Sequence, residues 1–306
     1  MFDSVLSVAS RVLILFIMIA VGYVLSKTGS ITKRGAQQIN FILFYVVTPT
    51  LIISSLQGMI GRVSLTNLLM AGGLAVVCML IGIVISKFFF RNSIYERKKV
   101  LRFACVYSNC AYMGIPLAQG VAGDSGVAYA SMFIVVFNLF VWTHGYACMS
   151  NMHGFSWKKI VTNPGLIGIV IGLPLFAFSI RLPEVLNSPM GSFASLNTPL
   201  AMIVVGCYIA RVSIKELFED TSLYLMSVVR LVLIPLVSFA VLYLLHVDKT
   251  IATTVLILCA APPAATTAMF AAQFGGDAKL ASKSVAIATL FSMITMPVFI
   301  LLAKLF

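Results

Sequence analysis

The chain has 306 residues, of which 60% are hydrophobic and only 10% are charged. So few polar side chains cannot cover a water-soluble domain, and the composition therefore predicts an all-α membrane protein with several spans. The net charge of +12 would suit a nucleic-acid partner, but the basic residues follow the loops between apolar segments. We therefore expect membrane lipid, and no nucleic acid, as a partner.

Ten apolar runs have the length of about 20 residues that crosses a bilayer core. They predict helices near residues 5–25, 36–56, 64–88, 100–121, 126–149, 161–180, 192–212, 222–246, 251–274 and 278–304. The first run contains Arg11 and lacks a basic leader and a cleavage site, so we expect a retained span rather than a signal peptide. The six cysteines lie in apolar stretches without metal-ligand spacing, which predicts buried thiols, no disulfide framework, no metal site and no cofactor.

The basic residues predict an orientation in the membrane. If the loop after the first helix is cytoplasmic, the cytoplasmic loops hold most of the 21 Lys and Arg residues. By the positive-inside rule, this bias predicts a multi-pass plasma-membrane protein with both termini outside. The charged run from Glu96 to Lys99 fits this topology signal better than it fits a lipid-headgroup patch.

Two of the apolar runs are interrupted near their middle by small, polar and proline residues. These breaks span Tyr107 to Pro116 and Cys259 to Thr267. Backbone that leaves the helical path in lipid exposes unpaired N–H and C=O groups, so it survives only where protein buries it or where it lines a watery cavity. Paired breaks in corresponding positions of two repeats are the best sequence-level indication of a transporter's binding site.

The breaks belong to a weak internal repeat. Asn109 and Pro262 lie 153 residues apart, as do Gly123–Asp124 and Gly276–Asp277, while Thr48–Pro49 and Thr198–Pro199 lie 150 apart. This offset predicts two five-helix repeats, residues 1–150 and 161–306, joined by a short cytoplasmic linker at 151–160. Because five is an odd number, the second repeat must be inverted relative to the first.

Two polar side chains inside the spans each allow two interpretations. Asn109 could present its amide to a carboxylate or hydroxyl of a substrate, or it could tie down the freed backbone of its own kink. Arg230 lies about eight residues into helix eight, and no acidic residue lies in any span. It could balance an anionic substrate, or it could bind backbone carbonyls exposed by a broken helix, which we favour slightly.

Other residues near proline kinks are weaker candidates. Pro262 and Pro263 remove two N–H donors, and Thr266 and Thr267 could satisfy that backbone or contact a ligand. Thr48–Pro49 and Asn197-Thr198-Pro199 kink helices two and seven, and we expect them to flank a cavity, although such prolines are often mere packing kinks.

The spans hold no carboxylate for proton relay or charged sodium ligation. His144 is the only histidine well inside a span; it could titrate near neutrality, but it is better explained as a hydrogen-bonded packing residue. Uncoupled movement of an anion down its own gradient and the membrane potential is therefore attractive. Sodium sites built from neutral oxygens remain open.

The segment Asn109-Cys-Ala-Tyr-Met-Gly-Ile-Pro-Leu117 resembles the Asn-x-x-x-x-Gly-x-Pro signature of helix four in the auxin efflux carrier family. Asn163-Pro164, and Pro263 with the segment Ala271 to Asp277, are similar to the family as well. The resemblance implies ten helices in two inverted repeats, as in the bile acid:sodium symporters, with broken helices four and nine crossing at the substrate site. Helices one, two, six and seven would form a scaffold, and helices three to five and eight to ten a mobile core with elevator-like alternating access.

The short linker distinguishes the chain from plant auxin carriers, which commonly carry a long hydrophilic loop. It resembles instead the short microbial members described as malate or malonate permeases, which implies a small carboxylate substrate and a possible homodimer. The candidate substrate-binding residues are Asn109, Met113, Gly114, Pro262, Pro263, Thr266, Thr267, Arg230, Thr48, Pro49, Asn197 and Thr198.

The sequence also leaves alternatives to a secondary transporter of a small organic anion. A ligand-binding membrane sensor on a transporter fold remains open because fold does not establish function, and so does a sodium-coupled carrier of a larger amphipathic acid. An enzyme is not expected, because the chain has no HExxH motif and no paired membrane aspartates, and Gly275-Gly-Asp277 lacks a partner acid.

Overall fold

The computed structural model describes residues 2–61, 63–150, 164–211 and 218–306. These residues are helical, apart from turns, short extended stretches and one isolated backbone bridge. In these described ranges, six helical segments are long and apolar enough to cross a membrane: Lys33–Gly58, Leu65–Phe88, Cys110–Met149, Glu184–Ile209, Thr221–Leu244 and Ala278–Leu305. The protein is therefore an all-helical, multi-pass membrane protein. The predicted linker at 151–160 lies outside the described residues.

Ten spans were predicted, whereas the described residues contain these six long segments, of which Cys110–Met149 overlaps two predicted spans. Shorter apolar helices lie at Phe16–Lys27, Leu166–Ala177 and Lys249–Ala260. The first half contains α1 (Phe2–Lys27), α2 (Lys33–Ile42), α3 (Thr48–Gly58), α4 (Leu65–Phe88), α5 (Tyr95–Val106), α6 (Ile115–Phe140) and α7 (Tyr146–Met149). The second half contains α9 (Pro164–Ala177), α10 (Glu184–Ser195), α11 (Asn197–Ile209), α13 (Thr221–Val228), α14 (Ile234–Leu244), α15 (Lys249–Ala260), α16 (Thr266–Gln273) and α17 (Ala278–Leu302). Single π-helical turns join some of these: η1 (Leu43–Val47), η2 (Cys110–Gly114), η3 (Val141–Gly145) and η4 (Val229–Leu233).

The predicted fourth and fifth spans meet inside α6. Gly123 has φ 62° and ψ −150°, so the helical path breaks there although α6 continues on both sides. Residues with a Cβ rarely adopt this conformation, whereas glycine does so at little cost. Gly123 therefore separates the half-helix that follows the first break from the next span.

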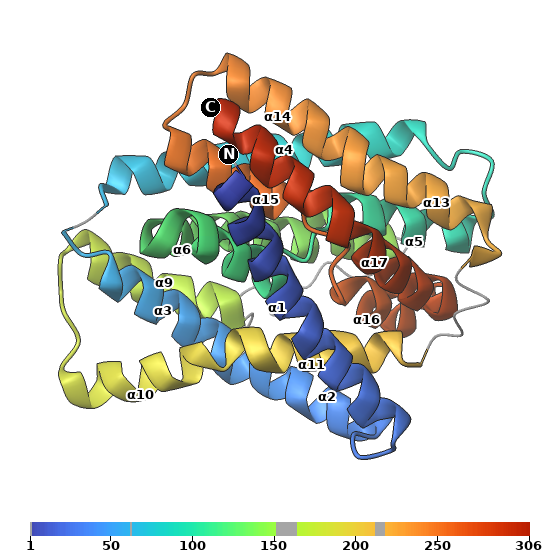
Figure 1. Cartoon of the computed structure of the whole chain (residues 1–306), viewed down its shortest axis with the longest axis horizontal. Helices are drawn as coiled ribbons and strands as arrows, with labels where there is room; N and C mark the ends of the chain where they lie inside the picture. Colours follow the sequence, from blue (N-terminus) through green and yellow to red (C-terminus); the bar gives the residue numbers. More distant parts are fainter. Residues whose placement is uncertain (1, 62, 151–163, 212–217) are drawn as a thin grey trace.

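Two helix pairs are held by direct backbone contact. A Cβ at Gly22 of α1 would lie 2.2 Å from the carbonyl oxygen of Ile203 in α11, and one at Gly206 would lie 2.0 Å from that of Ile19. In the second pair, a Cβ at Gly168 of α9 would lie 2.9 Å from Cα of Pro49 in α3. Small residues permit this close approach, which supplies the packing energy between membrane helices. Figure 1 shows α1 crossing α11, and α9 running beside α3.

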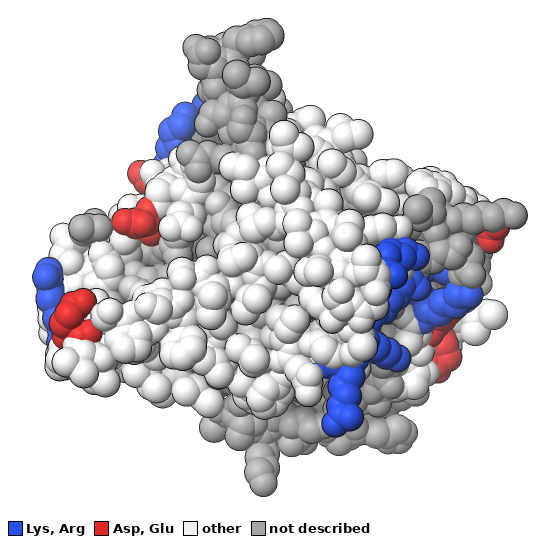
Figure 2. Space-filling model, turned by 60° about the horizontal axis from the view of Figure 1, so that its bottom comes forward, with Lys and Arg blue, Asp and Glu red and all other residues white. Residues whose placement is uncertain are grey.

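Basic side chains gather at one end of the molecule, the right-hand end in Figure 2, where α13 and α17 begin in Figure 1. Several of them cap helix ends. Arg102 donates to the carbonyl oxygens of Lys87 (2.9 Å), in the last turn of α4, and of Phe89, just after it. Lys99 is buried and donates to the carbonyl oxygens of Met149 (3.3 Å) and Phe274 (3.5 Å). Cations at helix C-termini satisfy orphan carbonyls and complement the helix dipole. The charged run that we interpreted as a topology signal therefore also holds helix ends together.

Candidate functional site

The first break separates α5 from α6. The helix ends at Val106, Tyr107 is extended (φ −97°, ψ 103°), and Asn109 has φ −77° and ψ 53° before η2 begins. Pro116 lies in the first turn of α6, directly after η2, and cannot donate a helical hydrogen bond. Ser108 and Asn109 are short polar residues, which disfavour a helix interior, so the chain leaves the helix here and resumes helical structure at Cys110.

The second break separates α15 from α16. Ala261 is extended (φ −61°, ψ 148°), as expected for a residue that precedes a proline. Pro262 and Pro263 cannot donate backbone hydrogen bonds, so the helix cannot continue through them. Helical structure resumes at Thr266.

The two breaks meet and pair through their backbones. The N–H of Asn109 donates to the carbonyl of Pro262 at 2.6 Å, and the N–H of Ala264 donates to that of Tyr107 at 2.9 Å. These bonds form an antiparallel bridge between Ser108 and Pro263. Backbone groups freed by each break are thus satisfied by the other break, which is what a low-dielectric interior requires.

Glycine and aromatic contacts fix the crossing further. A Cβ at Gly114 would lie 2.9 Å from Cδ2 of Leu258, so η2 packs directly on α15, and Met113 beside it is buried. The hydroxyl of Tyr107 donates to the carbonyl of Phe140 at 2.9 Å and lies 2.8 Å from Nδ1 of His144. His144 therefore has the packing and hydrogen-bonding role that we favoured for it.

Arg230 joins the two broken helices from the side. It is 1% exposed and donates to carbonyl oxygens at the ends of both α5 and α15: Cys105 (3.0 Å), Val106 (3.4 Å), Ala261 (2.9 and 3.0 Å) and Cys259. These ends carry unpaired carbonyls and the negative pole of each helix. Of the two roles that the sequence allowed for Arg230, these contacts are those expected if it binds backbone carbonyls rather than an anionic substrate.

Several buried polar atoms around the crossing have no hydrogen-bond partner among the residues that the structure describes. They are Oγ of Ser108, Nδ2 of Asn109, Oγ1 of Thr266, Oγ1 of Thr267 and Oδ1 of Asn197. Asn197, in α11, is tied to the crossing because its Nδ2 donates to the carbonyl of Ala111 in η2 at 3.5 Å. An unsatisfied buried polar atom costs about 1–3 kcal/mol. Such a cluster is typical of a site that receives polar partners from a ligand or water.

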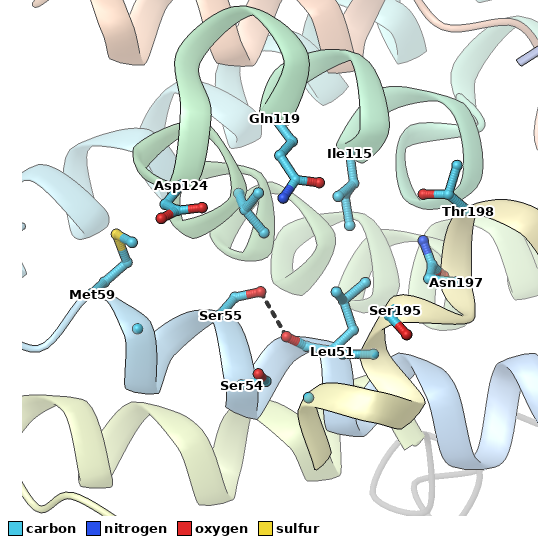
Figure 3. Close-up of a pocket in the computed structure, with 14 residues that line it drawn as sticks. Leu51, Ser54, Ser55, Met59, Ile115, Gln119, Asp124, Ser195, Asn197 and Thr198 are labelled. Carbon is cyan, nitrogen blue, oxygen red and sulfur yellow. Dashed lines mark hydrogen bonds between the residues drawn. The ribbon is translucent and has the colours of Figure 1, made fainter. Parts of the chain in front are cut away.

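A cavity of about 450 Å³ lies beside this cluster, between α3, α6, α10 and α11. Figure 3 shows Gln119 and Asp124 extending from α6 into the space above Ser54 and Ser55 of α3. Its lining comprises Leu51, Ser54, Ser55, Gly58, Met59, Ile115, Gln119, Asp124, Val127, Gly191, Ala194, Ser195, Asn197 and Thr198. The cavity reaches the crossing at Asn197 and at Ile115, in the first turn of α6.

Of the predicted site residues, only Asn197 and Thr198 line the cavity, while those of the two breaks lie at the crossing. Thr48 and Pro49 are not part of the cavity lining: the hydroxyl of Thr48 donates to the carbonyl of Leu43 in η1 at 2.8 Å, and Pro49 packs against Gly168. Sequence reasoning missed Gln119 and the serine pair. The sequence could have indicated them as candidate cavity residues, since each is a polar residue inside an otherwise apolar span.

A multi-pass helical protein whose two broken helices meet beside a polar cavity has the architecture of a membrane transporter. The chain belongs to the membrane transport protein family, whose model matches residues 7–300, and within it the protein is auxin efflux carrier-like.

Two archaeal relatives are similar along nearly their whole length. An uncharacterized transporter of Methanothermobacter thermautotrophicus is 23% identical over 299 residues, which cover 94% of this chain and 95% of the relative. An uncharacterized transporter of Methanocaldococcus jannaschii is 24% identical over 297 residues, covering 92% of this chain and 94% of the relative. The protein is thus a membrane transporter by family.

Proposed function

We propose that the protein is a secondary transporter of a small organic anion, a carboxylate of the size of malate or malonate, which binds at the crossing of the broken helices. The observation that carries this proposal is the group of unpartnered buried polar atoms there, next to a cavity through which a solute can arrive. The cavity volume of about 450 Å³ is sufficient for a small carboxylate with water around it.

The chemistry of the crossing suits a carboxylate. Nδ2 of Asn109 is an unused donor, and the hydroxyls of Thr266 and Thr267 can donate as well. Helical structure begins again just after each break, at Cys110 and at Thr266, and helix N-termini favour negative charge. Arg230 neutralises the negative poles at the ends of α5 and α15. The positive poles at the starts of η2 and α16 are then the helix dipoles that act on a bound anion.

The packing supports an elevator mechanism on a ten-span fold of two inverted repeats. The close pairs α1–α11 and α3–α9 are equivalent under exchange of the two halves, because each joins the first span of one half to the second span of the other. These pairs would form the scaffold, and the cavity would lie between it and the core helix α6. Sliding of the core along the scaffold would then carry the crossing from one side to the other.

The distribution of charge supports the orientation with both termini outside. The cavity lining includes Gly58 and Met59, at the C-terminal end of α3. The basic residues Lys33 and Arg34 lie at the opposite end of the same span, where α2 begins. If the basic end is cytoplasmic, the cavity faces outside, and the structure is in an outward-facing state.

Transport into liposomes tests this function. Purified protein would be reconstituted, and the uptake of labelled malate, malonate and indole acetate measured while sodium, proton and voltage gradients are imposed one at a time. We expect saturable uptake of a small dicarboxylate that is driven by voltage. No uptake of any acid under any gradient, from folded protein, would contradict the proposal and favour a ligand-binding sensor.

A further inference from the structure

Four carbonyl groups of the two broken helices converge on a single point in the core. They belong to Cys105 and Val106 at the end of α5, and to Cys259 and Ala261 at the end of α15. Each helix ends at these residues, so their carbonyls have lost intrahelical partners. The convergence concentrates the negative poles of two helices in a place that water does not reach.

Such an arrangement is a cation site in physical terms. In carriers with broken helices, unwound carbonyls and half-helix C-terminal ends are the groups that coordinate a dissolved sodium ion. Here the guanidinium of Arg230 occupies the place of the ion. Nε donates to Ala261, Nη1 to Cys105 and Val106, and Nη2 to Cys259 and Ala261.

The guanidinium is fully committed to these carbonyls. It has five N–H groups, and the five contacts account for all of them, while the residue is only 1% exposed. No donor therefore remains for a substrate. Arg230 lies in η4, the π-helical turn between α13 and α14.

We propose that Arg230 is a tethered monovalent cation that fills a carbonyl-lined ion site between the two broken helices, so that the crossing assembles without a dissolved alkali ion. Removal of the side chain would open a latent site for a small monovalent cation, and guanidinium would fit it best because it reproduces the planar donor fork. The consequence for transport rests on the proposed function: carboxylate uptake is independent of sodium.

Thermal unfolding of purified protein tests the proposal without any assumption about the substrate. Arg230→Ala would be melted in buffers of equal ionic strength that contain guanidinium, sodium, potassium or N-methylglucamine at low millimolar concentrations, beside wild-type protein and Arg91→Ala. Arg91 is an exposed arginine that stacks on Phe88, so its variant controls for general effects of each salt. The buried cysteines near the site provide a thiol-reactive fluorescence readout of unfolding.

We expect Arg230→Ala to melt roughly 10 °C below wild type, as the loss of a buried charged partner implies, and to recover saturably with guanidinium. Wild type and Arg91→Ala should show no saturable response to any of the cations. If Arg230→Ala does not fold, Arg230→Lys is melted instead, and it should be intermediate because an ammonium ion offers three donors to four carbonyls.

Three results would overturn the proposal. They are a saturable stabilisation of wild type by sodium, failure of guanidinium to stabilise folded Arg230→Ala, and wild-type stability of Arg230→Met. A protein that passes these tests but takes up no carboxylate would leave the tethered cation in place and contradict only the proposed function.

Discussion

The backbone N–H of Asn109 donates to the carbonyl of Pro262 at 2.6 Å. These two residues lie 153 positions apart in the sequence, the same offset that separates the pairs Gly123–Asp124 and Gly276–Asp277. The points of the two breaks that we predicted to be equivalent therefore touch, which is the arrangement expected of an inverted repeat with crossing broken helices. The relationship links the sequence repeat directly to the candidate substrate site.

Replacing Gly206 by alanine should destabilise the protein. A Cβ there would lie 2.0 Å from a backbone oxygen of α1, so the two helices must separate, at a cost of about 1–3 kcal/mol or more. Urea or thermal unfolding in detergent measures the loss. Gly73 in α4 is the control, because a Cβ there meets nothing within 4 Å, so Gly73→Ala should be neutral or slightly stabilising. Equal stability of the two variants would contradict the close packing.

Asp220 should give the protein a pH-dependent stability. Partial burial acts to raise the pKa of this carboxyl, but hydrogen bonds from Ser222 and Arg97 outweigh burial and hold the pKa below its usual value. Because the folded-state pKa is the lower one, the contribution is full above the unfolded pKa of about 3.9 and is lost as the pH falls through the folded-state pKa.

Asp220→Asn should therefore be less stable than wild type at pH 7, and the difference should shrink toward zero as the pH falls below both pKa values. Asparagine can still accept at the N-cap of α13, so the comparison isolates the charge. Thermal melts across pH measure it, with the exposed Glu184→Gln as the control. A difference that stays constant with pH would show that the carboxylate charge is not responsible.

The cavity should be reachable from the outside of the cell. Ser54 lines it, whereas Asn92 is exposed at the basic end of the molecule. In intact cells, a membrane-impermeant thiol reagent should label Ser54→Cys, and it should label Asn92→Cys only after permeabilisation. The reverse pattern would place the termini inside, and labelling of neither residue would contradict an open cavity.

Gln119 should affect substrate entry more than folding. Its side chain is exposed and projects into the cavity from α6 (Figure 3). Replacement by leucine removes a polar group from the path, so we expect the KM for uptake to rise by up to roughly tenfold, the equivalent of one hydrogen bond, with an unchanged melting temperature. Gln57, whose amide bonds to Ile180 (3.0 Å) and Leu182 (2.8 Å) beyond α9, is the contrasting control. Gln57→Leu should lower the melting temperature instead.

The breaks were predictable because their causes are local. Pro262 and Pro263 lack N–H groups wherever they stand, and Ser108 and Asn109 are short polar residues that disfavour a helix interior. The apolar runs also predicted where most of the described helices lie, since a span in lipid needs a fixed length of apolar sequence, but α10 begins before the run predicted at 192–212. Asn109 could be singled out for its polar side chain beside a break.

The partners of the site residues were not predictable. The carbonyls that bind Arg230 lie 31 and 125 residues away in the chain, so only the tertiary arrangement distinguishes its two interpretations. The cavity depends in the same way on how α3 faces α6, which no local pattern encodes. Ser54 and Gln119 were therefore not predicted as cavity residues, although each is polar within an apolar span.

The central claim is that the substrate binds at the crossing of the two broken helices. The most direct test is the uptake of labelled dicarboxylate by Asn109→Ala, beside Asn138→Ala, whose amide donates to Ile134 in its own helix at 2.9 Å. Loss of an unpaired donor that meets the substrate should raise the KM about tenfold in Asn109→Ala, with wild-type melting temperature. Asn138→Ala should transport like wild type. Unchanged KM in folded Asn109→Ala would contradict a substrate site at the crossing.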